Sequence, residues 1–413
     1  MLIYWLWLAS RPGLSDREKL AVLQHFSEPE ELYYADKKAF DHIAGLSDQG
    51  REALLDKDLT QARQIERGCQ EEQLHILTYR DAAYPRRLQN IPDPPVVLYY
   101  KGRLPQVDEY PVIGVVGTRS ATAYGLTCAK RLGYQIGRCG GIVVSGMAKG
   151  IDGLAMAGAL TAGAPVIGVL GCGADMVYPA SNRALFQDTQ RFGCILSEFP
   201  PGTPPAKWTF PKRNRIISGL SCGVLVVEAP EKSGALITAR LAAEQGRDVF
   251  AVPGTIDNAS CMGSNALLRE GAAMACCGWD IMQEYALLYP DKIRKDTDPS
   301  PMTLAPEEGP APAKVAQNPE RPRKNRKIKK ELGKDTVDNQ PPSPYSEKDV
   351  REQSLSQEEQ QILRCLEQGE RLTDDIVAET GLTTGKLLAA LTMLELKGIV
   401  KRLPGKRITL RKC

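Results

Sequence analysis

The sequence is poor in histidine, and its cysteines follow no ligand or disulfide pattern. Only three histidines occur, His25, His42 and His75, and none of the eleven cysteines belongs to a C-x-x-C pair. Zinc sites and disulfide frameworks need regular spacing of such residues. We therefore expect no metal site and no cofactor, and we expect reduced, mostly buried thiols in a cytoplasmic protein.

Long apolar runs and a large net charge are also missing. No segment approaches the roughly 18 apolar residues that a membrane span requires, and we expect no signal peptide in the apolar start Met1–Leu8, which has no basic leader. Lys and Arg total 53 against 50 Asp and Glu, a net charge of +3. No global positive field attracts nucleic acid or membrane, so any basic binding surface must be local.

What is present is ordinary globular composition, with 42% hydrophobic and 25% charged residues among 413. At about 150 residues per domain, this length predicts two or three domains. Residues 1–75 are predicted to form short helices, with a capping box of Ser15 and Glu18 and a longer helical stretch over about 48–74. We expect a helical domain of the SAM or helix-hairpin-helix type, or a plain helical packing module, and then a proline-rich extended connector over 76–110.

Short apolar runs recur between residues 111 and 287, and most are followed by a glycine-containing turn and 10–16 residues of helical pattern. Runs that are apolar throughout and alternate with helices indicate a parallel sheet covered on both faces. The fold class is therefore α/β, with a Rossmann-like core whose ligand site lies beyond the carboxyl ends of the strands. The predicted strands are Val112–Val116, Ile142–Val144, Val166–Leu170, Cys194–Leu196, Val224–Val227 and Val249–Val252.

The remaining sequence divides into a linker and a small domain. Residues 288–350 are rich in proline, poor in apolar residues and contain the basic run Arg321–Lys330. We expect a disordered linker that either only tethers or adds weak attraction to DNA. Residues 351–413 combine a capping box of Ser356 and Glu359, two further helices and a basic hairpin. This order predicts a winged-helix domain that docks on DNA or on protein.

The turns after the first two core strands carry glycine, hydroxyl groups and a cation. The first reads Gly117-Thr-Arg119-Ser and the second Ser145-Gly-Met-Ala-Lys149-Gly. Helix N-termini favour anions, and Arg119 and Lys149 add positive charge. Because neighbouring strands end at one rim, we expect a phosphate pocket there, although the first turn is not the G-x-G-x-x-G of dinucleotide sites. The alternative is a capped helix with Arg119 in a salt bridge.

The stretch from Lys207 to Arg215, K-W-T-F-P-K-R-N-R, holds four cations and two aromatic rings without an acid. Such interleaving suits single-stranded nucleic acid, because bases stack on rings while phosphates pair with cations, at roughly 1–3 kcal/mol per stacked base. We expect this stretch to bind DNA rather than only to pack. With about four phosphates neutralised, the double-logarithmic salt slope of binding would be roughly −3. Ser233-Gly234 opens a further helix in the same way.

In their order, several motifs resemble those of the DprA/Smf family, DNA-processing protein A. They are G-T-R-S, S-G-M-A-K-G-I-D, Y-P-x-x-N, F-P-K-R-N-R-I-I-S-G-L-S, S-G-A-L-I-T-A and V-P-G. The resemblance is strong over about 111–275 and looser over the N-terminal helices and the winged helix. It implies a cytoplasmic homodimer that binds single-stranded DNA and protects incoming strands during natural transformation. It also implies loading of a RecA-type recombinase onto strands coated by single-strand-binding protein.

Carried onto this sequence, the resemblance implies a specific set of DNA-binding residues. Lys149 stands where family members often carry Arg, so the charge is kept without bidentate geometry. The implied residues are Gly117, Arg119, Lys149, Phe210, Lys212, Arg213 and Arg215, with Asn214 and Ser233 as further candidates.

Two other classes of function are open from the sequence. Related Rossmann-like folds hydrolyse the N-glycosidic bond of nucleoside monophosphates with an Arg and a Glu beside a P-G-G-x-G-T loop. Here the run Val252–Ile256 breaks that loop, although Glu198 and Glu228 lie near strand ends. No Walker lysine motif, paired metal carboxylates or Ser-His-Asp set occurs, and we expect no catalysis. A transcriptional regulator led by the winged helix is the other alternative.

Overall fold

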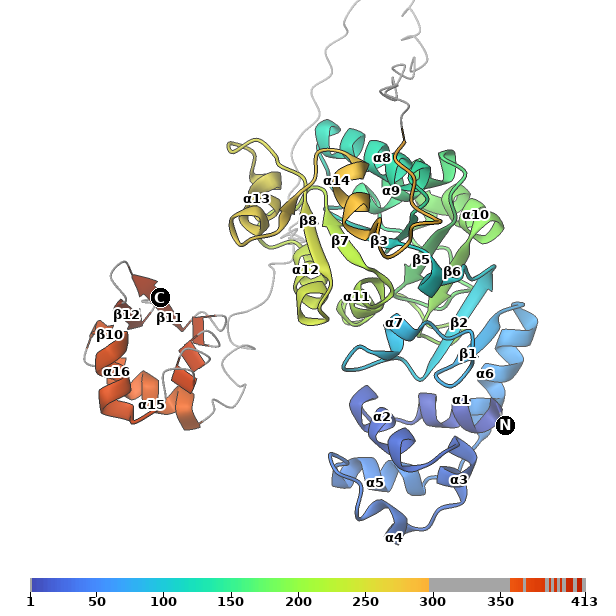
Figure 1. Ribbon diagram of the computed structural model, residues 1–413. Helices are drawn as coiled ribbons and strands as arrows, with labels where there is room; N and C mark the ends of the chain where they lie inside the picture. Colours follow the sequence, from blue (N-terminus) through green and yellow to red (C-terminus); the bar gives the residue numbers. More distant parts are fainter. Residues whose placement is uncertain are drawn as a thin grey trace, which may run out of the picture. The chain divides into compact units, whose positions relative to one another are not determined.

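The computed structural model describes residues 2–296 without a gap. In the C-terminal part it describes residues 357–366, 369–382, 386–387, 390–391, 394–395, 399–403 and 407–410. The chain divides into two compact units, Met1–Pro312 and Ala313–Cys413, and each is described by itself (Figure 1). Over these described ranges, no helix is both long and apolar enough to cross a membrane.

Six helices occupy the N-terminal part of the first unit: α1 Leu2–Ser10, α2 Asp16–His25, α3 Pro29–Tyr34, α4 Lys37–Phe40, α5 Asp48–Leu55 and α6 Thr60–Glu71. α2 begins at the predicted capping box, in which the Ser15 hydroxyl accepts the Glu18 N–H and the Ser15 N–H donates to the Glu18 carboxylate. The helix expected over about 48–74 is two helices. Asp56 and Asp58 each accept a hydrogen bond from the backbone N–H two residues later, at 2.9 Å, and so turn the chain between them.

A nine-stranded sheet forms the centre of the first unit, in the order β1-β2-β6-β5-β4-β3-β7-β8-β9. The strands are β1 His75–Thr78, β2 Val97–Gly102, β3 Val112–Val116, β4 Ile142–Ser145, β5 Val166–Leu170, β6 Cys194–Ser197, β7 Gly223–Val226, β8 Asp248–Ala251 and β9 Ala273–Met274. From β6 to β9 in this order, neighbours pair in parallel. All six predicted core strands are present, and the Rossmann-like α/β class is confirmed.

The segment 76–110, expected as an extended connector, supplies an edge of this sheet. β2 pairs antiparallel with both β1 and β6, and Val97, Leu98 and Tyr99 are buried. The prolines of the segment lie outside its strands, where no ladder N–H group is needed. Proline density therefore indicated turns correctly but concealed the buried strand that follows them.

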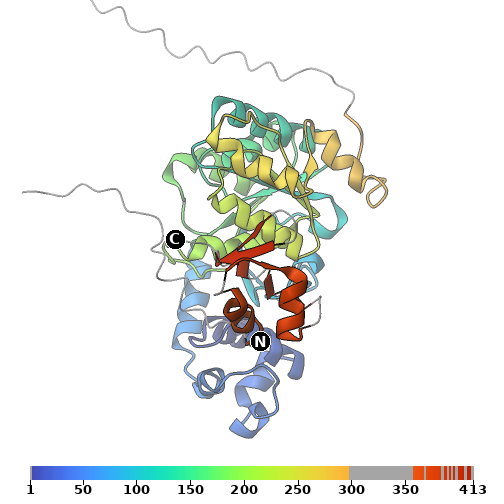
Figure 2. The same cartoon turned by 90° about the vertical axis from the view of Figure 1, so that its left-hand side faces the viewer.

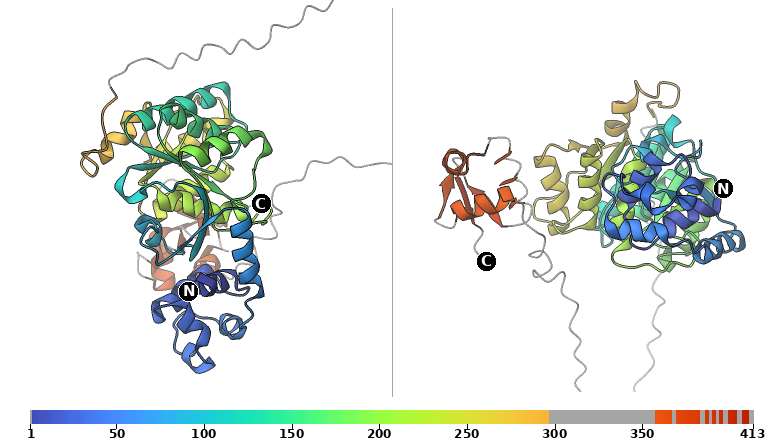
Figure 3. Two further views of the ribbon diagram at one scale, coloured as in Figure 1. Left: turned by 90° about the vertical axis from the view of Figure 1, so that its right-hand side faces the viewer. Right: turned by 90° about the horizontal axis from the view of Figure 1, so that it is seen from below.

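Helices cover both faces of the sheet (Figures 1, 2 and 3). They are α7 Arg86–Gln89, α8 Ala123–Arg138, α9 Ile151–Thr161, α10 Arg183–Phe192, α11 Thr209–Leu220, α12 Gly234–Glu244, α13 Met262–Arg269 and α14 Gly278–Met282, with 3-10 turns η1 Val107–Glu109, η2 Ala180–Asn182, η3 Ala259–Cys261 and η4 Gln283–Tyr285. Alternate residues of a strand point to opposite faces. In β3, Ile113 and Val115 belong to a hydrophobic cluster that includes residues of α8, α9, α10 and α14, whereas Val112 and Val116 belong to a second cluster that includes residues of α7, α11 and α12.

The strand order reverses at β3. The chain passes from β3 through β4 and β5 to β6 toward one edge, and then returns to place β7 on the other side of β3. The connections that leave β3 and β7 therefore lead away from each other. In open parallel sheets, such a switch point opens a crevice beyond the carboxyl ends of the strands, and ligands bind there.

The described parts of the second unit have the predicted winged-helix order. They are α15 Gln357–Leu366, β10 Arg371–Leu372, α16 Thr373–Thr380, β11 Val400–Leu403 and β12 Arg407–Leu410, with the sheet order β10-β12-β11. As predicted, α16 stops at Gly381, where φ is +66°. Ser356 of the second capping box and residues 297–350 of the linker lie outside the described residues. The start of the segment expected as a disordered linker, residues 288–296, instead packs on the first unit, where Ile293 is buried.

Candidate nucleic-acid site

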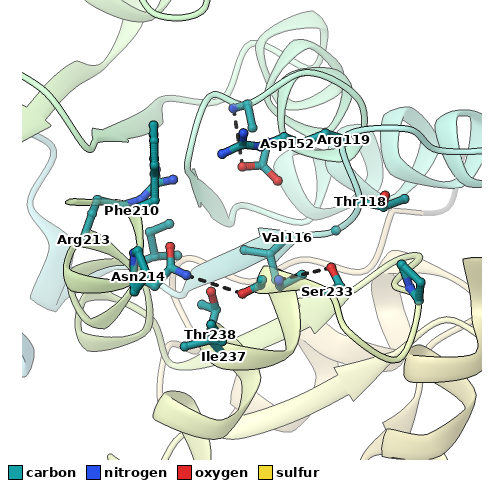
Figure 4. A pocket seen from close by; sticks show the side chains of 17 residues that line it. Val116, Thr118, Arg119, Asp152, Phe210, Arg213, Asn214, Ser233, Ile237 and Thr238 are labelled. Atoms are coloured by element: carbon teal, nitrogen blue, oxygen red, sulfur yellow. Dashed lines mark hydrogen bonds between the residues drawn. The ribbon is translucent and has the colours of Figure 1, made fainter. Parts of the chain in front are cut away.

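The crevice at the switch point holds a pocket of about 330 Å³ (Figure 4). It is built by the turns after β3 and β4, the loop after β7, and the first turns of α11 and α12. Six of the nine predicted site residues line it, namely Gly117, Arg119, Phe210, Arg213, Asn214 and Ser233. The fold therefore brings together segments that lie more than a hundred residues apart in the sequence.

Contacts beneath the turn after β3 hold it in one conformation. Thr122 caps α8, and Glu228 at the end of β7 accepts hydrogen bonds from the Thr122 N–H at 3.0 Å and from its hydroxyl at 2.6 Å. Gly117 has no room for a side chain, because an added Cβ would lie 2.5 Å from Ile151. These contacts fix the turn that presents Arg119 to the pocket.

Arg119 is exposed and lies beside an aromatic ring. Its guanidinium carbon is 5.0 Å from the ring centroid of Phe210. Within the described parts of the chain it has no ion-pair partner, so the alternative of a salt-bridged Arg119 is not what the structure contains. A cation beside a ring matches the two halves of a nucleotide, since the phosphate pairs with the charge and the base stacks on the ring.

Among the helices that follow β3, β4 and β7, only α12 presents a positive end without a carboxylate. Asp152 lies in the first turn of α9, and Glu228 is bound at the start of α8 through Thr122. α12 has no acid in its first turn, and the Ser233 hydroxyl accepts one of its N–H groups at 3.3 Å. A phosphate between Arg119 and the start of α12 would therefore meet a full positive charge and a favourable helix dipole.

Arg213 lines the pocket from beneath its surface. It is 5% exposed, and its guanidinium donates to the carbonyl oxygen of Val169 in β5. Burial lowers the pKa of Arg213 to about 10, and Asp152 opposes this shift. Burial raises the pKa of Asp152, and Arg213 opposes that shift in turn. Arg213 remains charged at neutral pH, and these contacts tie it to β5 and to the start of α9 beneath the pocket.

Lys212 and Arg215 point away from the pocket, toward the N-terminal helices. Arg215 is 4% exposed and forms ion pairs with Glu198 at 2.6 Å, Asp16 at 3.0 Å and Asp93 at 3.3 Å. Lys212 pairs with Asp16 at 2.9 Å. Burial alone would lower the pKa of Arg215, but Glu198 and Asp16 overcome it and raise that pKa. The structure thus does not bring these two predicted cations into the pocket.

Lys149 lies just outside the pocket, and Asn214 lies in its wall. Lys149 is exposed on the turn after β4 and is not part of the pocket lining. Its turn contacts the turn after β3 through a hydrogen bond from the Ile151 N–H to the Thr118 carbonyl, at 3.3 Å. Lys149 therefore extends the positive rim outside the pocket, whereas Asn214 lines the pocket and donates to the start of α12 at 3.4 Å.

Tyr178 is a candidate that sequence reasoning did not assign. Its ring centroid lies 5.7 Å from that of Phe210, and it is 36% exposed. Asn182 ties this loop to the turn after β4, because its amide donates to the carbonyls of Met147 and Ala148 at 2.9 and 3.2 Å. Both residues belong to the Y-P-x-x-N motif, but only the fold shows that this motif places a second ring next to Phe210.

The carboxylates near the strand ends take part in structural contacts. Each oxygen of Glu228 accepts a hydrogen bond from Thr122, and Glu198 binds Arg215. N-glycosidic hydrolysis would need a carboxylate placed to act on the sugar, and these two are held elsewhere. Over residues 2–296 and the described C-terminal segments, no cluster of His, Cys, Asp or Glu side chains is arranged to hold a metal ion.

Comparison with known proteins gives two family matches and several relatives. The family model of DNA recombination-mediator protein A matches residues 75–286, and that of the DprA winged helix domain matches residues 346–406. Protein Smf of Synechocystis is 33% identical over 98% of this chain and 97% of its own length. DNA processing protein DprA of Bacillus subtilis is 42% identical over 55% of this chain and 76% of its own. The X-ray structure of DNA processing protein A from Streptococcus pneumoniae matches with a TM-score of 0.60 at 34% identity, over 69% of this chain and 98% of that one.

Proposed function

The chain belongs to the DprA/Smf family of DNA recombination mediators, and from this premise we propose that its pocket binds single-stranded DNA for delivery to a RecA-type recombinase. One observation carries the proposal: the exposed Arg119 lies 5.0 Å from the Phe210 ring and lines the same pocket as the acid-free start of α12. This arrangement offers one binding group for a phosphate and another for a base.

The bound strand follows the rim of the sheet. A phosphate lies between Arg119 and the start of α12, and a base stacks on Phe210, with Tyr178 as the next ring along the strand. Every nucleotide carries the same phosphate, and every base has a flat face that can stack on an aromatic side chain, so binding is largely independent of the DNA sequence. With Arg119 and Lys149 as the exposed cations, the salt slope is roughly −1.4. This is shallower than the −3 expected from the sequence, because Arg213 and Arg215 are buried.

The partners follow from this role. The protein acts in the cytoplasm as a homodimer, protects incoming strands during natural transformation, and loads the recombinase onto DNA coated by single-strand-binding protein. It works by binding and not by catalysis, in keeping with the structural contacts of Glu198 and Glu228. The winged helix adds a second contact, to DNA or to protein.

Competition binding tests the substrate class. The full chain is bound to a labelled oligothymidylate and challenged with unlabelled single strand, duplex and mononucleotide. We expect the single strand to displace the label far more effectively than the other two. Equal displacement by duplex would contradict a pocket built for unpaired bases. Displacement by mononucleotide, with release of free base on incubation, would instead support the hydrolase.

Strand exchange tests the delivery step. A RecA-type recombinase is assayed on single strands coated with single-strand-binding protein, with and without the full chain. We expect wild-type protein to shorten the lag before strand exchange. With Arg119→Ala, the lag should be as long as in the reaction without the protein. Equal stimulation by wild type and Arg119→Ala would mean that recombinase loading does not depend on the pocket, and would refute this part of the proposal.

A further inference from the structure

A second groove lies at the opposite rim of the sheet, at the amino ends of its strands. It has a volume of about 640 Å³, roughly twice that of the switch-point pocket. Its walls are the segment after β2, the residue before β5, the first residue of β4 and the end of α10. Five-residue strands such as β3 separate the two rims by roughly 16 Å, at about 3.3 Å per residue. The groove is therefore distinct from the switch-point pocket.

The groove combines cations and rings in the same way as the first pocket. The Arg191 guanidinium carbon is 5.1 Å from the Phe192 ring centroid, and the Lys292 ammonium is 4.4 Å from the Tyr110 ring centroid. Phe192 is 55% exposed, so its ring is accessible from the groove. Arg103 adds a second exposed guanidinium to the lining. Two guanidinium groups and two rings thus line one hollow, and Lys292 contacts one of these rings without being part of the lining.

The charges of the groove are not neutralised by its own walls. Its lining contains no Asp or Glu. Neither Arg103 nor Arg191 has an ion-pair partner among the residues that the structure describes. Asp188, three residues before Arg191 in α10, is not part of the lining. Asp108 and Glu109 line a neighbouring pocket that shares the 103–106 segment with the groove. Asp108 already accepts the backbone N–H groups that begin α7, at 2.8 and 3.3 Å.

Helix capping explains only part of this arrangement. Arg191 lies in the last turn of α10, where a cation complements the negative end of the helix dipole. Arg103 follows a strand, so no helix end accounts for it, and capping gives no reason for the exposed Phe192 ring. The dipole carries about half a charge, whereas Arg103 and Arg191 carry two full charges, so the groove remains positive.

From these contacts we propose that the amino-end groove is a second binding site for single-stranded nucleic acid. Phosphates pair with Arg103 and Arg191, and a base stacks on Phe192. An acidic peptide would satisfy the guanidinium groups but would gain nothing from the exposed ring, so the rings favour a nucleic acid. The site goes beyond the proposed function, because the chain then holds unpaired strand at both rims of one sheet.

Stoichiometric titration tests the second site. The full chain is titrated with a labelled oligothymidylate of about six nucleotides, a length within the site sizes of single-strand binding folds. We expect the double variant Arg103→Ala/Arg191→Ala to bind one strand fewer per chain than wild type, while the strand that remains keeps the salt slope of roughly −1.4 set by Arg119 and Lys149. Arg119→Ala should instead lose the strand that binds in the switch-point pocket and keep the strand in the amino-end groove. The matched control is Arg269→Ala, an exposed arginine in the last turn of α13, which should change nothing.

Photocrosslinking assigns each lost strand to its rim. A 4-thiothymidine hexamer should crosslink to peptides that contain Tyr110 or Phe192 in wild type and Arg119→Ala, but not in the double variant, and thermal melting verifies that each variant is folded. Full stoichiometry in the folded double variant, or no crosslink at either ring, overturns the second site and leaves the Arg119 pocket standing. Displacement of the groove-bound hexamer by polyglutamate as readily as by unlabelled DNA overturns its assignment to nucleic acid in favour of an acidic protein.

Discussion

Replacing Arg119 with alanine is the most direct test of the pocket. The side chain is exposed, and its contact with the protein is with the Phe210 ring at 5.0 Å. A cation–ring contact at an exposed site is worth about 0.5–1 kcal/mol, so the fold should lose little. Hydrogen bonds from the guanidinium to a phosphate are worth about 1.5–3 kcal/mol. We therefore expect roughly 10- to 150-fold weaker binding of single-stranded DNA, with a nearly unchanged melting temperature.

Anisotropy titrations with labelled oligothymidylate at several salt concentrations give both the affinity and its slope. The slope should become shallower by roughly 0.7, the value for one phosphate contact on a single strand. Arg119→Lys should keep the slope but bind less tightly than wild type, because an ammonium cannot form the bidentate contact. Arg131→Ala is the matched control, since it removes an exposed arginine from α8, the helix that follows the same turn. A folded Arg119→Ala protein with wild-type affinity and slope would refute the assignment.

The remaining predictions concern stability and stacking. Arg215→Ala should lower the free energy of unfolding by about 3–5 kcal/mol, because three carboxylates lose a buried partner; urea denaturation measures this, and a loss below about 1 kcal/mol would contradict the ion cluster. Partial burial raises the pKa of Glu18, but hydrogen bonds from Ser47 and Ser15 overcome it and lower that pKa from 4.5 to about 2. Since the folded pKa lies below the unfolded one, this stabilisation is complete above about pH 4.5. It is lost as the pH falls toward 2, so unfolding free energies of Glu18→Gln should vary less with pH over that range than those of wild type. Tyr178→Ala should weaken DNA binding by about 1–3 kcal/mol without changing the salt slope, because it removes a ring and no charge; a changed slope in the anisotropy assay would count against stacking.

The sequence alone determined the local structure of this protein and the main components of its pocket. Apolar runs located the six core strands because residues buried on both faces must be apolar throughout. Local rules also located the cap at Ser15 and the end of α16 at Gly381. Parallel strands end at one rim, so Arg119 and Lys149 were predicted to share a phosphate pocket; the pocket lining contains Arg119, whereas Lys149 lies outside it.

The tertiary structure decided which cations remain available. Helical periodicity places Phe210, Arg213 and Asn214 on one side of α11 and the pair Lys212 and Arg215 on another, but it does not say which side meets solvent. The answer depends on Asp16, which lies 199 residues from Arg215 in sequence and 3.0 Å from it in the fold. Charge is a property of a residue, whereas its neutralisation depends on contacts that only the folded chain creates.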